Sequence, residues 1–186
     1  SLGTVTFSAN DHDGVTASVS LALSVKDDVP SASMTAEVAG VVEVEDMPGG
    51  IEENEAPDLT ATVSGNVSDN GSWGADGFDE LTQIQVSGSV ITVPVSGAPV
   101  TVYWTQAGVF NGTDSTGAAA NMVVNPNGSY TFTLTDNMLI SGTAEQVDSL
   151  GTVTFTGKDN DGDTATVTLA LSVKDDVPSA SMTREV

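Results

Sequence analysis

Apolar and polar residues alternate along most of this chain with the two-residue period of β-strands. Val, Thr, Ser and Gly are abundant and strong helix formers are scarce, which also favours strands. The pattern predicts strands within 84–86, 90–95, 100–104, 122–124, 129–134, 153–155 and 165–173. Short turn sequences separate them, among them Asn-Pro-Asn-Gly at 125–128 and Asp-Asn-Asp-Gly-Asp at 159–163. The segment 144–149 is the one modest helix candidate. We therefore expect an all-β protein, a β-sandwich of immunoglobulin-like or cadherin-like architecture.

The two ends of the chain nearly repeat each other. Residues 1–38 and 149–186 differ at eight positions (8, 9, 10, 12, 15, 18, 20 and 36), so 38 − 8 = 30 residues match at an offset of 148. Such a match is typical of a tandem array. The sequence Val-Lys-Asp-Asp-Val-Pro, at 25–30 and 173–178, ends each copy, because proline cannot continue a central strand.

These boundaries predict a complete sandwich over 29–176. Residues 1–28 would then be the last two strands of a preceding repeat, and 177–186 the start of the next. Because 1–28 nearly matches 149–176, it can compete for the same place in cis, swap between chains or stay loose. The sequence leaves these alternatives open, although we expect a monomer whose partners are neighbouring repeats of the same chain.

The charge balance excludes several classes of function. The chain has 26 acidic and 4 basic residues, for a formal net charge of −22, so it has no basic face for nucleic acid or anionic lipid. It has no cysteine, and its single histidine, His12, is expected to be an exposed turn residue. No apolar run is long enough for direct membrane insertion, and no catalytic motif is present, so we expect no enzyme.

The turn at 159–163 is a candidate metal site. Asp159, Asp161 and Asp163 alternate along a turn that contains glycine, so three carboxylates can converge on one hard cation. Calcium is the cation that such oxygen ligands favour, and a plain hairpin turn is the alternative. The first copy keeps Asp11 and Asp13 but has valine in the third position, so it should bind more weakly.

A second candidate site lies at the repeat boundary. The pair Asp175 and Asp176, with its copy Asp27 and Asp28, places two like charges side by side, which a bridging cation would offset. The loop 68–80 can supply further ligands, for which the candidates are Asp69, Asp76 and Asp79. A polar linker is the alternative. For the acidic run within 43–58, a mobile acidic loop is favoured over a dedicated site.

Several segments together resemble a known family. They are VSGNVSD at 63–69, GADGF at 74–78, VVNPNGSYTF at 123–132, and the turn at 159–163 followed by DDVP at 175–178. The chain is similar to the extender repeats of giant RTX adhesins secreted by type I systems, and to the related VCBS-type, cadherin-like repeats. The resemblance implies an extracellular β-sandwich module of a bacterial cell-surface fibre of the kind used in adhesion and biofilms. It also implies calcium at Asp159, Asp161 and Asp163 and at the pair Asp175 and Asp176.

The expected function is mechanical. Residues 29–176 contain 21 acidic and 2 basic residues, a net charge of −19. Calcium bound in the loops and between neighbours would offset this charge, stiffen each junction and hold a distal ligand-binding domain away from the cell. The alternative is a recognition module for sugar or protein that uses Trp73, Trp104 or Tyr103 as its platform.

Overall fold

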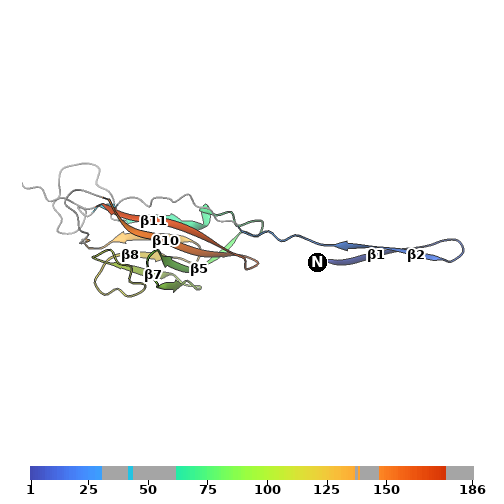
Figure 1. Ribbon diagram of the computed structural model, residues 1–186, viewed down its shortest axis with the longest axis horizontal. Helices are drawn as coiled ribbons and strands as arrows, with labels where there is room; N and C mark the ends of the chain where they lie inside the picture. The colour runs from blue at the N-terminus through green and yellow to red at the C-terminus, as the bar shows by residue number, and fades with distance from the viewer. Residues whose placement is uncertain (31–41, 44–61, 137, 139–146, 175–186) are drawn as a thin grey trace, which may run out of the picture.

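A computed structural model describes residues 1–30, 42–43, 62–136, 138 and 147–174, and shows an all-β protein (Figure 1). One sheet has the strand order β3-β11-β10-β5-β6, and a second has the order β4-β9-β8-β7. The first sheet contains β3 (Val42–Glu43), β5 (Phe78–Val86), β6 (Thr92–Pro94), β10 (Val147–Asp159) and β11 (Thr164–Lys174). The second contains β4 (Thr62–Asn66), β7 (Val100–Thr105), β8 (Ala118–Val124) and β9 (Ser129–Leu134). A short 3-10 helix, η1 (Val67–Asn70), follows β4.

The two sheets pack as a sandwich with one core. Alternate residues of β7 to β11 point inward, so β10 and β11 supply one wall of the core and β7, β8 and β9 supply the other. The ring of Tyr130 on β9 stacks on Phe155 of β10 at a centroid distance of 6.0 Å, which joins the sheets directly. Trp104 and Phe132 pack edge to face at 5.6 Å in the same core. We call the part formed by residues 62–134 the sandwich body; β10 and β11 complete its first sheet.

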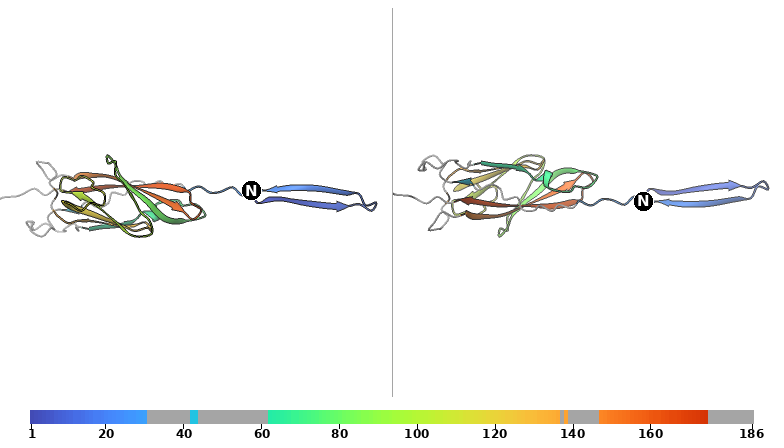
Figure 2. Two further views of the ribbon diagram at one scale, coloured as in Figure 1. Left: turned by 90° about the horizontal axis from the view of Figure 1, so that it is seen from below. Right: turned by 90° about the horizontal axis from the view of Figure 1, so that it is seen from above.

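A separate hairpin extends from one end of the sandwich. Strands β1 (Gly3–Asn10) and β2 (Thr16–Leu23) pair only with each other and form a two-stranded sheet. The views of Figures 1 and 2 agree that this hairpin projects along the long axis, away from the sandwich. Both strands are exposed along their full length. Residues 24–30 connect the hairpin to the end of the sandwich where the turn at 159–163 lies.

Most predicted strands are present, and their turns have the expected chemistry. The 125–128 turn joins β8 to β9, and Gly128 has a φ of +89°, which a side-chain-bearing residue rarely adopts. The strand predicted over 90–95 is shorter, since β6 begins at Thr92 and Val90 is almost fully exposed. The immunoglobulin-like or cadherin-like architecture and the repeat boundaries at 28/29 and 176/177 stay predictions.

The predicted helix over 144–149 is wrong where the structure describes it. Residues 147–149 begin β10, in which Asp148 lies opposite Val173 of β11. Pairing with a long neighbouring strand overrides the weak local helix preference of this short segment. Residues 144–146 lie outside the described residues. So does nearly all of the acidic run at 43–58, of which Glu43 is part of β3, paired in parallel with β11.

Candidate cation site at the junction between hairpin and sandwich

The turn between β10 and β11 gathers three carboxylates. Asp159 ends β10, Asp161 lies at the tip, and Asp163 precedes β11. One carboxylate oxygen from each of the three lies within 4.8 Å of the others. Two oxygens bound to one calcium ion at about 2.3–2.6 Å lie no more than about 5 Å apart, so this spacing fits a single ion.

Asp159 is buried and only half satisfied. Its residue exposure is 1%, the lowest of any aspartate that the structure describes. Oδ1 accepts hydrogen bonds from the backbone N–H groups of Gly162 at 3.0 Å and Asp163 at 2.8 Å, which fixes the turn. Oδ2 is buried with no hydrogen-bond partner. A buried carboxylate oxygen without a partner is costly, and a bound cation would remove that cost.

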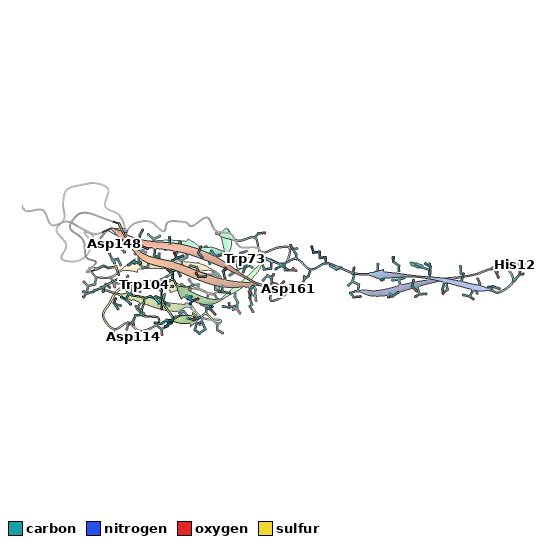
Figure 3. All side chains as sticks on the ribbon, viewed as in Figure 1. His12, Trp73, Trp104, Asp114, Asp148 and Asp161 are labelled. Atoms are coloured by element: carbon teal, nitrogen blue, oxygen red, sulfur yellow. The ribbon has the colours of Figure 1, made fainter. Side chains whose placement is uncertain are left out.

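A second group of carboxylates shares Asp161 with the first. One oxygen each of Asp27, Asp76 and Asp161 lies within 4.8 Å of the others. Asp27 belongs to the linker after β2, and Asp76 to the loop before β5, so three distant segments meet here. The side-chain amide of Asn160 donates to the backbone carbonyl of Asp76 at 2.6 Å, which holds the loop against the turn. Figure 3 shows Asp161 at the end of the sandwich that faces the hairpin.

Asp28 binds the linker to the same loop. Its Oδ2 accepts a hydrogen bond from the backbone N–H of Ala75 at 3.1 Å. The loop can approach this closely because Gly74, at a φ of +69°, has no side chain: a β-carbon there would lie 2.9 Å from Oδ2 of Asp28. The two residues of the predicted boundary pair therefore have different contacts. Asp27 lies in the second group of carboxylates, and Asp28 binds the backbone of the loop before β5.

The surroundings of Asp163 raise the pKa of its carboxyl group. Loss of solvation is the largest cause, and the negative charges of Asp161, Asp159 and Asp27 follow in that order. Lys158 on β10 offsets part of the negative charge at this end of the sandwich. Its ammonium nitrogen lies 3.1 Å from both Asp79 Oδ2 and Glu80 Oε1. These carboxylates, Asp79 first, raise the pKa of Lys158.

The remaining candidate ligands are not gathered into either group. Asp79 forms an ion pair with Lys158, and Asp69 contacts the hydroxyl of Ser68 at 3.5 Å. Asp11 and Asp13 lie at the far tip of the hairpin, beside His12, and form no group of three acidic side chains there within residues 1–30. Asp175 and Asp176 lie outside the described residues.

Three contributions to this site were not foreseen from the sequence. Lys158 takes Asp79 out of the candidate ligand set, the amide of Asn160 anchors Asp76, and Asp159 is buried. The first joins β10 to β5, and the second joins the β10–β11 turn to the loop before β5, so both are contacts between segments far apart in the sequence. The signal available for the third was the alternation of β10, which puts residue 159 on the same side of the strand as buried Phe155.

The two tryptophans of the recognition alternative are buried. Trp104 is fully buried in the core, and Trp73 is 6% exposed, with its indole N–H donating to the carbonyl of Ser68 at 3.0 Å. Neither ring offers a face for stacking on a sugar. Tyr103 is half-buried. His12 is exposed in the turn between β1 and β2, as predicted.

No protein-family model and no curated protein sequence matches this chain. Among the described residues there is also no helix of the length and hydrophobicity needed to cross a bilayer.

Proposed function

We propose that this chain is a calcium-stabilised structural extender module of a bacterial surface adhesin. The observation that carries the proposal is the buried, unpaired Oδ2 of Asp159 within a group of converging carboxylates. Oxygen ligands at this spacing suit calcium, which takes six to eight of them, whereas magnesium demands a smaller and more rigid shell.

The position of the site gives the ion a mechanical role. Asp27 comes from the linker, Asp76 from the loop before β5, and Asp161 from the turn between β10 and β11. A cation held by the three would join what precedes the linker to the sandwich. Without it, the same carboxylates repel one another and weaken the junction. The 148-residue offset between near-identical segments supports a spacer, because spacers are built by repetition.

The adhesin context, secretion by a type I system and location outside the cell follow from the resemblance of the segments at 63–69, 74–78, 123–132 and 159–178. Outside cells, calcium is abundant enough to fill sites of modest affinity, and the bound ions would offset part of the net charge of −22.

Titration calorimetry on the chelator-treated chain tests the site. We expect saturable calcium binding that magnesium at equal concentration does not reproduce, and loss of that binding in Asp161→Asn, which removes the carboxylate common to both groups. Small-angle scattering tests the mechanical role: calcium should narrow the distribution of distances between hairpin and sandwich. Calcium binding without that narrowing would leave a stabilising ion but refute the stiffened junction.

A further inference from the structure

The β1–β2 hairpin has an uncovered apolar face. Register pairs Phe7 with Val19, Val5 with Leu21 and Gly3 with Leu23, so these apolar side chains lie on one face of the two-stranded sheet. All are exposed: Phe7 is 58%, Val19 66% and Leu21 54% accessible. An exposed face of this kind marks an interaction surface.

The copies of these side chains in β10 and β11 indicate what would cover this face of the hairpin. Strand pairing there has the same register, with Phe155 opposite Val167 and Val153 opposite Leu169. These four residues, the copies of Phe7, Val19, Val5 and Leu21, are at most 1% exposed because the sandwich body covers them. The hairpin therefore carries the complete inward face of a strand pair that finishes a sandwich of this type.

One of the eight differences disfavours docking of the hairpin in this particular body. Ala9 stands where β10 has Gly157. A β-carbon on Gly157 would lie 2.6 Å from Cη2 of Trp73 and 2.9 Å from Cε2 of Phe78. Trp73 has little room to yield, because it is buried, packs edge to face on Phe78 at 4.7 Å and donates to the Ser68 carbonyl.

A second difference acts in the same direction. Asn10 replaces Lys158, so the hairpin in this position would leave Asp79 and Glu80 without their ammonium partner. Both differences lie at the turn end of the strand, whereas the apolar residues that fill the core are unchanged. The hairpin thus keeps the apolar residues needed to complete a sandwich of this type, but it fits this particular body less well than β10 and β11 do.

We propose that the β1–β2 hairpin docks as the last two strands of a second β-sandwich body of this type, one with a side chain smaller than tryptophan at the position of Trp73. Ala9 disfavours docking in another copy of this chain. The contact between Gly157 and Trp73 then favours β10–β11 over the nearly identical β1–β2 hairpin in this body. It thereby opposes exchange of the two strand pairs between bodies.

Cysteine cross-linking tests the proposal, since the chain has no cysteine of its own. Thr154 of β10 lies opposite Gln85 of β5, and Thr6 is the copy of Thr154. A donor with Thr6→Cys and an acceptor with Gln85→Cys are unfolded together, refolded in calcium and oxidised. A disulfide between them reports the hairpin in the acceptor body, and Thr154→Cys with Gln85→Cys in one chain shows that the geometry permits the bond.

We expect Ala9→Gly in the donor to raise the yield of the cross-linked heterodimer about tenfold, as relief of an overpacked contact predicts. Trp73→Ala in the acceptor should raise the yield similarly with the donor that keeps Ala9. If Trp73→Ala prevents the acceptor from folding, the Ala9→Gly comparison still tests the proposal, because it leaves the acceptor body unchanged. Phe7→Asp in the donor should abolish the cross-link, whereas Thr4→Asp, on the opposite face, should not.

Three results would overturn the proposal. Equal yields from donors with and without Ala9→Gly would show that residue 9 does not select the body, and a second copy of this chain would be an acceptable partner. No cross-link from the Ala9→Gly donor, with the one-chain control intact, would show that the hairpin does not dock in this way. A cross-link that survives Phe7→Asp would indicate unspecific apolar association. None of these results bears on whether calcium binds.

Discussion

Replacing Asp159 with asparagine should change the stability of the protein in opposite directions with and without calcium. Asparagine keeps the Oδ1 acceptor for the N–H groups of Gly162 and Asp163, so the turn is retained. The substitution removes a buried negative charge and one carboxylate ligand. Removal of the charge affects stability in chelator, and removal of the ligand affects stability in calcium.

The magnitude in chelator follows from the spacing. Like charges 4.8 Å apart, the upper limit within this group, repel by about 0.9 kcal/mol at the dielectric constant of water and about 3.5 kcal/mol at a dielectric constant of about 20. Asp159 has two such neighbours, of which Asp161 is exposed and Asp163 half-buried, so the lower value per pair applies and Asp159→Asn should stabilise the calcium-free protein by roughly 1–2 kcal/mol. For a sandwich of this size that corresponds to a rise in Tm of about 4–8 °C.

In calcium the order reverses. A site of one ion at about a hundred times its Kd stabilises the wild-type chain by about 2.7 kcal/mol, or about 10 °C in Tm. The variant should lose most of this increment and melt below the wild type. Circular dichroism melts of both proteins, in chelator and in excess calcium, measure the four values.

Asp11→Asn is the matched control. The two turns share their backbone hydrogen bonds, and Asp11 Oδ1 accepts from the N–H groups of Asp13 and Val15 at 3.0 and 2.8 Å. Unlike Asp159, Asp11 is exposed and has no third carboxylate in its turn. We expect no shift in either buffer. A Tm for Asp159→Asn that falls equally in chelator and calcium would show that Asp159 only supports the turn, and a wild-type Tm unaffected by calcium would refute the cation site.

Three further outcomes are expected. Because the folded state raises the pKa of Asp163, that group binds its proton more tightly when the protein is folded. In chelator, the destabilisation caused by its charge should therefore be relieved as pH falls through this raised pKa, and the Tm difference between wild type and Asp163→Asn should shrink. A constant difference would contradict this. Gly157→Ala should destabilise the sandwich by about 1–3 kcal/mol in denaturant titrations through its contact with Trp73, and Trp73→Leu should recover part of the loss; a neutral Gly157→Ala would show that the indole moves aside freely. Asp28→Ala removes the bond to the Ala75 amide and should increase amide exchange in that loop, with the core strands as the internal reference; unchanged exchange would mean that the linker does not hold the loop.

The sequence by itself determined the features that depend on near neighbours. Because the side-chain period of a strand is a local property, strand alternation predicted the β-class and the strands from β5 to β11, although not β3 or β4. The turn at 159–163 brings its three aspartates together through residues two apart in one loop. The repeat identified the hairpin as a strand pair, since the same residues recur in β10 and β11.

Only the tertiary structure decided which side chains from distant segments meet. Asp27 and Asp76 join Asp161, while Asp79, equally suitable in sequence, pairs with Lys158 instead. Burial of Asp159 and of Trp73 depends on how the end of β10, in the middle of its sheet, packs with β5 and the loop before it. Composition showed an acidic chain, but which of its charges act together is a matter of distances, and those are set by packing between strands far apart in the chain.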